Sequence, residues 1–386
     1  MHFITSITAN YLPKARILAQ SVKNNCSNAS FTLLVADNLP QDFNLDHEPF
    51  DQLWQIENLS LPVSNLKQWI FKHTVVELCT AIKGQAILQL LEQNNQDKVI
   101  YLDPDIVVFS DLSDLETRLE DYSIVLTPHL TEPEKTKRGV IDNEICALQH
   151  GTYNLGFLAV KKDPQGLQFA RWWRDRLVDF CFDDIPGGLF TDQRWIDLAP
   201  AFFDRVYIER NPGYNVATWN MSNRVISEQD GRYYVNDCPL QFYHFSGFDS
   251  GAQEAMLKIY GSSMTAFKLR EWYIDKLNEA GQNKQGEIPP VYGFFSNGEV
   301  ITKLHRQVMR TRPDVDEYFS QADPFNVDDH QSYYHWFKNE ILGNNDLITE
   351  EKDLYIASLE QEIARLKRIL KPFMPFKKLY KLFYKG

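Results

Sequence analysis

The stretch "KVIYLDPDIVVFSDL", residues 98–112, decides the prediction of the fold. Its apolar start is typical of a buried strand, which leads directly into Asp103, Pro104 and Asp105. Side chains two residues apart on an extended chain project to one side, and Pro104 keeps Asp103 extended, so we expect the two carboxylates to converge. Such carboxylates repel each other unless a cation or a shared proton lies between them. Oxygen ligands favour Mg²⁺ or Mn²⁺, and the alternative is a solvated acidic turn after an edge strand.

Strand and helix patterns alternate around this stretch. Helical patterns occur over residues 11–25, 67–93 and 166–182, and strand patterns over residues 2–9, 30–37, 98–102, 122–128, 153–161 and 205–210. We expect the second helix to break at Gly84 and residues 282–290 to form a linker loop. Strands separated by helices predict an α/β fold with a parallel sheet, in which ligands lie beyond the carboxyl ends of the strands.

Several sequence features argue against other classes of protein. The five cysteines are scattered, odd in number and without a CxxC pair, which argues against a disulfide framework or a structural zinc site and favours a reducing compartment. Neither a GxxxxGK[ST] loop nor a GxGxxG motif occurs, so neither a P-loop nor a dinucleotide site is expected. The chain starts with a strand pattern and contains no apolar run of 18 residues, so we expect neither a signal peptide nor a membrane-spanning segment.

The charge is distributed unevenly along the chain. Residues 363–386 carry eight Lys and Arg and no acid, so the −12 net charge leaves −20 on the remainder. An acidic body is not expected to bind nucleic acid. Residues 371–386 combine five lysines with aromatic side chains, a pattern typical of a helix on an anionic membrane surface; the alternative is docking on the acidic body. A short heptad pattern over residues 356–370 predicts either a homo-oligomer contact or packing on the body.

Five motifs follow one another in the order found in a known family. "VIYLDPDIVV", residues 99–108, is similar to the DxD element of the GT-A glycosyltransferases, especially the retaining glycosyltransferase family 8. Four further stretches resemble other elements of that family: "SITANYLPKARILAQSV", "YNLGFLAVKK", "TDQRW" and "FYHFSGFD". The resemblance extends over roughly residues 1–250.

The resemblance implies a role for each matched residue. It assigns Asp103, Asp105 and His244 as metal ligands, with Asp103 also facing the donor. It places the reacting sugar beside Asp192 and Gln193. The residues that it places beside the nucleotide sugar are Thr8, Asn10, Tyr11, Asn154, Gly156 and Gly247.

The chain departs from the family after Gly247. The family often has Lys-Pro at this point to hold the diphosphate, whereas this chain has Phe248 and Asp249. The cation that contacts the diphosphate is therefore left open, and Lys83 is one candidate.

Four of the matched residues also have a purely structural interpretation. His244, between two aromatic residues, would then be a hydrogen-bonded core histidine, and Asp192 would cap a helix that begins at the next residue. Asn154 would be a turn residue at a strand end, and Gly156 would mark a bulge.

The fold that the resemblance implies is GT-A: a Rossmann-like, single mixed and mostly parallel sheet flanked by helices, here with a C-terminal helical extension. The expected catalytic domain spans residues 1–250, with a nucleotide-sugar half over 1–110 and an acceptor half over 111–250. The helical extension is expected over 251–345, an amphipathic or coiled-coil helix over 346–370 and the basic aromatic tail over 371–386.

The expected function is that of a metal-dependent bacterial hexosyltransferase. Mn²⁺ is the first choice because imidazole suits it better than Mg²⁺, which is the alternative. We expect a UDP-sugar donor, retention at the anomeric carbon and a saccharide or lipid-linked saccharide acceptor in surface-polysaccharide synthesis. The enzyme is expected in the cytoplasm, peripheral on the inner face of the membrane. The alternatives are an inverting GT-A transferase and a non-catalytic, membrane-associated scaffold with a degenerate transferase fold.

Overall fold

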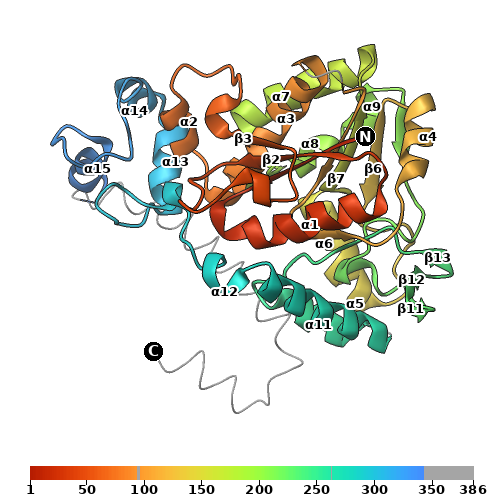
Figure 1. The fold of residues 1–386 in the computed structure, drawn as a ribbon. Helices are drawn as coiled ribbons and strands as arrows, with labels where there is room; N and C mark the ends of the chain where they lie inside the picture. Colours follow the sequence, from red (N-terminus) through yellow and green to blue (C-terminus); the bar gives the residue numbers. More distant parts are fainter. Residues whose placement is uncertain (94–95, 262, 343–386) are drawn as a thin grey trace.

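The main sheet of the molecule has seven strands. A computed structural model describes residues 1–93, 96–261 and 263–342 of the protein (Figure 1). β7 runs antiparallel to its neighbours β4 and β6, and the other neighbouring strands are parallel, so the predicted mixed, mostly parallel sheet is confirmed. The strands lie in the order β10 (Val206–Ile208), β6 (Ile124–Pro128), β7 (Tyr153–Lys161), β4 (Lys98–Leu102), β1 (His2–Ile7), β2 (Ser30–Val35) and β3 (Gln52–Gln55).

Helices cover both faces of this sheet. Phe3 and Ile100 pack against α1 and α4 on one face, whereas their neighbours Ile4 and Tyr101 pack against α3 and α7 on the other. This alternation is the two-residue period of an extended strand that is buried on both faces. The flanking helices are α1 (Leu12–Asn25), α2 (Leu66–Phe71), α3 (Val75–Gln93), α4 (Ser113–Asp121), α7 (Pro164–Phe180), α8 (Gln193–Ile196) and α9 (Ala199–Phe202).

The predicted helix break at Gly84 is wrong, because the chain breaks between α2 and α3 instead. Thr74 and Glu77 form reciprocal hydrogen bonds at the start of α3, with Thr74 N donating to Glu77 Oε2 at 2.7 Å. This is a capping box, which starts a new helix. A Cβ atom on Gly84 would lie 2.8 Å from the Cα atom of Arg174. The glycine therefore allows close packing of α3 on α7 and does not interrupt the helix.

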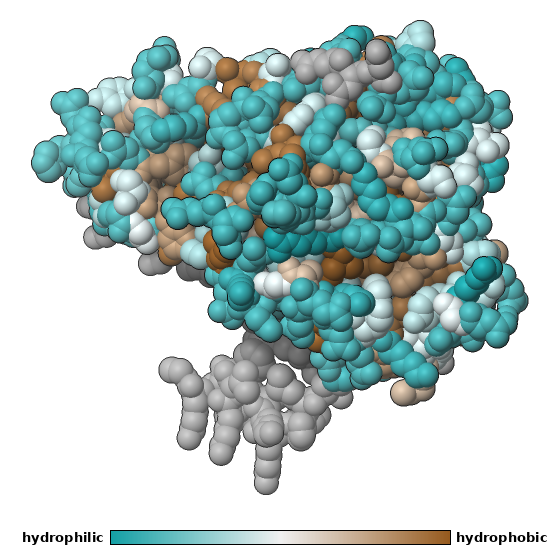
Figure 2. All heavy atoms as spheres, viewed as in Figure 1, coloured by the Kyte–Doolittle hydropathy of each residue, from teal (hydrophilic) through white to brown (hydrophobic). Residues whose placement is uncertain are grey.

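A second, smaller part of the fold lies beside the main sheet. β5 (Ile106–Val108) pairs antiparallel with β14 (Phe242–His244), and both share a core with α10 and α11. Ile17 of α1 packs against this core, and hydrophobic atoms are visible in the seam between α1 and α11 (Figure 2). Residues on both sides of position 250 share this core. The domain boundary that the sequence predicts at position 250 stays a prediction. This part also includes α10 (Ala252–Tyr260), α11 (Met264–Glu279), β11 (Ile226–Gln229), β12 (Arg232–Val235) and β13 (Cys238–Pro239). The remaining short elements are α5 (Lys137–Gly139), α6 (Ile145–His150), β8 (Asp183–Asp184) and β9 (Leu189–Phe190).

Short helical turns connect these elements. 3₁₀ turns occur at η1 (Ala9–Tyr11), η2 (Leu45–His47), η3 (Ile56–Asn58), η5 (Thr218–Asn220) and η6 (Val291–Gly293), and π-helical turns at η4 (Val140–Glu144) and η7 (Phe337–Ile341).

The C-terminal helices dock on the break between α2 and α3. Arg306 donates from its Nη1 atom to the carbonyl oxygens of Phe71, at 2.9 Å, and of His73. These bonds satisfy carbonyl groups that the end of α2 leaves unpaired. The helices concerned are α13 (Lys303–Thr311), α14 (Pro313–Tyr318) and α15 (Tyr333–Trp336), on one side of the molecule in Figure 1.

Two expectations about the C-terminal third have a different outcome. The predicted linker loop over 282–290 begins with a short helix, α12 (Gln282–Gln285), which Arg16 of α1 contacts through its hydrogen bond to Gln285 Oε1 at 2.6 Å. The predicted helix over 346–370 and the tail over 371–386 lie outside the described residues. Among the helices that the structure describes, none has the length and apolar character needed to cross a membrane.

Candidate active site

The two aspartates lie in a turn between β4 and β5. β4 ends at Leu102, and Ile106 N donates to the carbonyl oxygen of Asp103 at 3.0 Å, which closes the turn around Pro104. The two carboxylates do approach a common point, but a turn brings them there and not the predicted extended strand. β4 lies between β1 and β7, so the alternative of an acidic turn after an edge strand is wrong.

The third member of this group comes from a distant part of the chain. His244 is the last residue of β14 and lies opposite Ile106 of β5 in the antiparallel pair. Its Nε2 atom is 3.0 Å from Asp105 Oδ1 and 3.8 Å from Asp103 Oδ2. One ligand atom from each of the three side chains lies within 4.8 Å of the others, so they form a group that could hold a metal ion.

The chemistry and spacing of this group fit a divalent ion. Ligand atoms around an octahedral ion bound at about 2.1 Å are separated by about 3.0 Å in cis and about 4.2 Å in trans positions. The distances from His244 Nε2 to the two carboxylates fall in this interval. Burial lowers the pKa of His244, but the Asp105 carboxylate outweighs this effect and raises it overall. A metal ion would take the place of the imidazole proton in neutralising Asp105.

Asn154 and Gly156 orient the histidine from behind. His244 Nδ1 lies 3.2 Å from Asn154 Oδ1, so a histidine that binds metal through Nε2 can donate its other ring proton to this oxygen. A Cβ atom on Gly156 would lie 2.5 Å from His244 Cε1, so only glycine leaves room for the ring. The bulge interpretation of Gly156 is also met, because the register of β6 on β7 shifts between Leu126 and Pro128. Asn154 lies inside β7 and not in a turn.

Lys83 lies at the centre of a buried ionic network. Its side chain is 3% exposed, and its ammonium group contacts Asp103 Oδ1 at 3.1 Å, Asp192 Oδ2 at 3.0 Å and the carbonyl oxygen of Leu155 at 3.2 Å. Burial lowers the pKa of Lys83, yet the two carboxylates raise it well above its usual value. The contacts with Asp103 and Leu155 are hydrogen bonds and the contact with Asp192 is an ion pair, so three oxygens surround an ammonium group that has three protons.

Asp192 and Gln193 face this network from the start of α8. Asp192 has helical backbone angles and makes no side-chain cap bond, so the helix-cap interpretation is wrong. Burial raises the pKa of Asp192, and the ammonium of Lys83 opposes this rise. Gln193 Oε1 accepts from the backbone amide of Leu155 at 3.1 Å. Thr191, which precedes the pair, has φ +45°, a strained value for a β-branched residue.

The residues predicted to contact the nucleoside lie beyond the end of β1. β1 and β4 are parallel neighbours, so Thr8 and Asp103 follow their strands at the same edge of the sheet. Thr8 Oγ1 donates to Asn10 Oδ1 at 2.7 Å, and Tyr11 donates to Asp249 Oδ2 at 2.7 Å. Gly247, with φ +74°, lies in the turn after β14, and its predicted contact with the donor stays a prediction.

Three residues of this region were missed at the level of sequence. Tyr101 donates to Asp103 Oδ1 at 2.8 Å, and its position two residues before Asp103 on a strand was a usable signal. Lys14 is buried on α1, one helical turn after Tyr11, and forms an ion pair with Asp249. Asp37, which follows β2, accepts from the amide of Ala9 at 3.1 Å, and the end of its strand pattern marked it.

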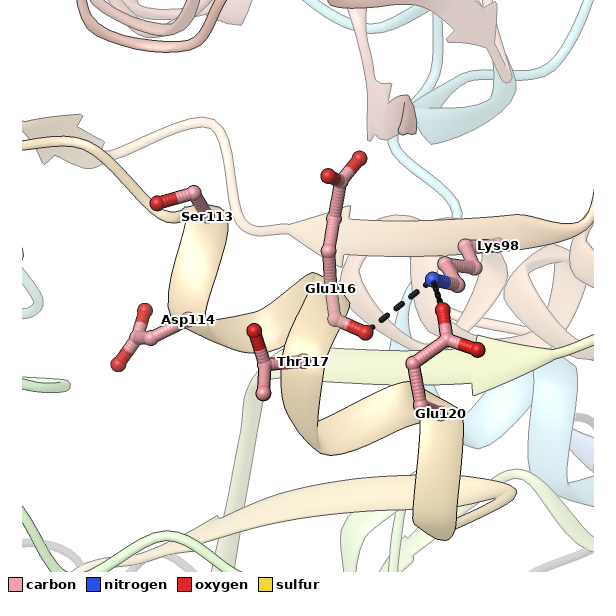
Figure 3. A pocket seen from close by; sticks show the side chains of 6 residues that line it. All are labelled: Lys98, Ser113, Asp114, Glu116, Thr117 and Glu120. Atoms are coloured by element: carbon pink, nitrogen blue, oxygen red, sulfur yellow. Dashed lines mark hydrogen bonds and ion pairs between the residues drawn. The ribbon is translucent and has the colours of Figure 1, made fainter.

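A separate surface pocket lies at the opposite end of β4 (Figure 3). Lys98, the first residue of that strand, contacts Glu120 and donates to the carbonyl oxygen of Glu116 at 3.1 Å. Since Asp103 follows the last residue of β4, this pocket is not part of the candidate site. Its lining residues are Lys98, Ser113, Asp114, Glu116, Thr117 and Glu120.

Comparison with known proteins shows which family the chain resembles. Residues 2–168 match the family described as "Glycosyl transferase family 8". The chain is a family 8-like glycosyltransferase. The resemblance suggested by the five motifs is thereby confirmed. This glycosyltransferase is 24% identical to the uncharacterized protein YfnD of Bacillus subtilis (strain 168) over 250 residues, which are 64% of the chain and 78% of YfnD. It is 29% identical to YfnF of the same organism over 229 residues, 58% of the chain and 74% of YfnF.

Two solved structures of glycosyltransferases are also similar to it. The galactosyltransferase LgtC, solved with donor and acceptor sugar analogs, shares 17% identity over 75% of this chain and 98% of LgtC, with a TM-score of 0.39. GlyE of Streptococcus pneumoniae TIGR4 shares 16% identity over 76% of this chain and 66% of GlyE, with a TM-score of 0.40.

Proposed function

We propose that this glycosyltransferase moves a hexosyl group from a nucleotide sugar, with UDP as the expected nucleotide, to a saccharide or lipid-linked saccharide acceptor. The observation that carries the proposal is the Asp103–Asp105–His244 group at the carboxyl end of β4, beside the end of β1. In open α/β sheets, ligands lie beyond this edge. The domain assignments, with nucleotide-sugar binding in residues 1–110 and the acceptor side in 111–250, belong to the same proposal.

The proposed metal site works through the donor's leaving group. A bound Mn²⁺ or Mg²⁺ would stabilise the negative charge that develops on the departing nucleoside diphosphate. Asp103, Asp105 and His244 would hold it, and the Asn154 side chain would keep the His244 ring in the orientation that points Nε2 at the two carboxylates. Mn²⁺ is the proposed ion because one of the three ligands is an imidazole.

Lys83 has contacts that favour a positioning role. Its ammonium group is matched with the two carboxylates and the Leu155 carbonyl, so it has little capacity left for a phosphate. We therefore assign it to holding Asp103 and Asp192 at a fixed separation. Asp192 and Gln193 remain the proposed neighbours of the reacting sugar, whose transition state carries positive charge at the anomeric carbon.

Binding of metal and donor is expected to be coupled. In a thermal-unfolding experiment with Mn²⁺ present, UDP at 100-fold excess over its Kd should stabilise the full chain by about 2.7 kcal/mol. With a chelator in place of Mn²⁺, the stabilisation should be much smaller, because the diphosphate then lacks its bridge to the carboxylates. Equal stabilisation in the two conditions would contradict a metal site at Asp103 and Asp105. The nucleotide sugar that stabilises the chain most identifies the donor to be tested for transfer.

Retention at the anomeric carbon belongs to the proposal because the "TDQRW" motif resembles the Asp-Gln element of the retaining family. Proton NMR of the early product decides between retention and the inverting alternative. Release of nucleoside diphosphate from the donor by purified protein argues against the non-catalytic scaffold.

The proposed place of action is the inner face of the membrane. It rests on the five lysines and the aromatic side chains of residues 371–386, which lie outside the described part of the chain. Co-sedimentation with anionic vesicles that is no stronger than with neutral vesicles would contradict it.

A further inference from the structure

Lys14 is a buried cation with an exposed partner. Its side chain is 2% exposed, and its Nζ atom lies 2.5 Å from Asp249 Oδ2, whereas the Asp249 side chain is 48% exposed. The ammonium group also lies 4.0 Å from the centre of the Tyr11 ring. A buried ammonium group needs an anion or equivalent acceptors. Here the anion is supplied from the surface side, by a residue 235 positions further along the chain.

This ion pair lies next to the proposed donor site. Tyr11, which the family resemblance places at the nucleoside, donates its hydroxyl proton to the same Asp249 oxygen at 2.7 Å. Asp249 lies five residues after His244, in the turn that follows β14. The ion pair of Lys14 and Asp249 therefore joins α1 to the segment that carries a proposed metal ligand.

Asp249 is a half-exposed residue in a turn that another residue anchors. The turn that carries it begins at Gly247 and ends at Gly251, which have φ values of +74° and +73°. Phe248 anchors the turn by packing on the Tyr273 ring at 5.3 Å. The Asp249 side chain itself is held through the two bonds from Lys14 and Tyr11. Its contact with Lys14 is thus separate from the Phe248 contact that anchors the turn.

The charges in this region explain why a second cation is needed. A metal-bound diphosphate carries more negative charge than one divalent ion neutralises, and an Arg or Lys commonly contacts it. Lys83 is matched with three oxygens, and the position after Gly247 holds Phe248 and Asp249. Lys14 is a buried cation, and its partner carboxylate, Asp249, is half-exposed.

We propose that Lys14 binds the diphosphate of the donor, and that Asp249 is an internal anion which neutralises Lys14 until the diphosphate displaces it. The proposal rests on the proposed function, since it presupposes a nucleoside diphosphate at the metal group. It assigns opposite roles to the two partners of one ion pair: Lys14 increases the affinity for the ligand, and Asp249 competes with it.

Calorimetric titration of the full chain with UDP in the presence of Mn²⁺ tests both roles. Lys14→Met is expected to weaken UDP binding by about ten- to hundredfold, the loss of one charge-assisted hydrogen bond, and to leave uridine binding unchanged. Lys14→Arg should retain most of the affinity because it keeps the charge. Asp249→Asn should tighten UDP binding several-fold, because the competing charge is removed.

The chain offers a matched control on the same helix. Lys23 of α1 pairs with Asp51 at 2.5 Å, and Asp51 also accepts from the amide of Phe31, near the start of β2 and thus at the opposite edge of the sheet. Lys23→Met should leave UDP binding unchanged. Melting curves of every variant show whether the fold is kept, and Asp249→Asn, at a half-exposed position, provides a test that does not depend on the buried lysine.

The outcomes separate this inference from the proposed function. If the unaltered chain binds no UDP with Mn²⁺, the proposed function fails and this inference fails with it. If the unaltered chain binds UDP but Asp249→Asn binds it more weakly or equally, the competition is refuted and the pair serves only to fasten the turn to α1. If Lys14→Met binds UDP as tightly as the unaltered chain, Lys14 does not contact the diphosphate.

Discussion

Asp105→Asn is expected to reduce glycosyl transfer at least about 100-fold, the scale seen when one preorganised group that stabilises transition-state charge is removed. Asparagine keeps the size of the side chain but loses the charge that lies 3.0 Å from His244 Nε2 and that a divalent ion requires. The measurement is the release of nucleoside diphosphate, across a Mn²⁺ titration, from the nucleotide sugar that stabilises the chain most.

Asp111→Asn is the matched control for this variant. Asp111 belongs to the same sequence stretch and is exposed on the surface, so its replacement should leave activity unchanged. If Asp105→Asn has the activity of Asp111→Asn over the whole Mn²⁺ titration, Asp105 is not a metal ligand in the reaction.

Lys83→Met is expected to destabilise the fold by about 3–5 kcal/mol, the usual cost of removing one partner from a buried ionic group. Without the ammonium, the almost completely buried Asp192 loses its cation, and Asp103 loses one of its polar contacts. The measurement is equilibrium unfolding in urea, with the free energy of unfolding extrapolated to water. Lys98→Met is the control, because Lys98 pairs with the exposed Glu120 and such pairs contribute about 0–1 kcal/mol.

A second substitution makes this prediction sharper. Adding Asp192→Asn to Lys83→Met removes the buried carboxylate that has lost its cation, so the double variant should be more stable than Lys83→Met alone. With Asp192→Asn measured alone as well, the coupling between Lys83 and Asp192 is the change in the double variant minus the sum of the changes in the two single variants. A cost for Lys83→Met no larger than that for Lys98→Met would refute the view that Lys83 holds the carboxylates in place.

The parts of the fold that could be predicted are those encoded in local patterns. Apolar runs located six of the seven strands of the main sheet, and the alternation of strands and helices predicted its mostly parallel arrangement. The missed strand is β3, a short edge strand of sequence QLWQ without an apolar run. The break between α2 and α3 was also readable, because Thr74 and Glu77 have the spacing of a capping box. Gly84 misled the analysis because its reason for being glycine is the contact with α7, which no local pattern contains.

The candidate site was predictable only in part, for a similar reason. Asp103 and Asp105 are neighbours in sequence, but His244 reaches them through two three-residue strands, which are too short to produce a periodic signal. Its assignment came from the family resemblance. Lys83 was identified, but its contacts with both Asp103 and Asp192 depend on how α3, β4 and α8 pack, and these contacts change its proposed role from a phosphate ligand to a positioning residue.

The close contact of α3 with α7 at Gly84 has a consequence for the chemistry. Lys83 is the adjacent residue of α3, so the distance between the two helices also determines how deeply its ammonium group enters the sheet edge. A methyl group at position 84 would push the helices apart and draw the ammonium group away from Asp103 and Asp192. We therefore expect a steric change at this helix–helix interface to lower catalytic activity, although Gly84 is not part of the proposed metal and sugar sites.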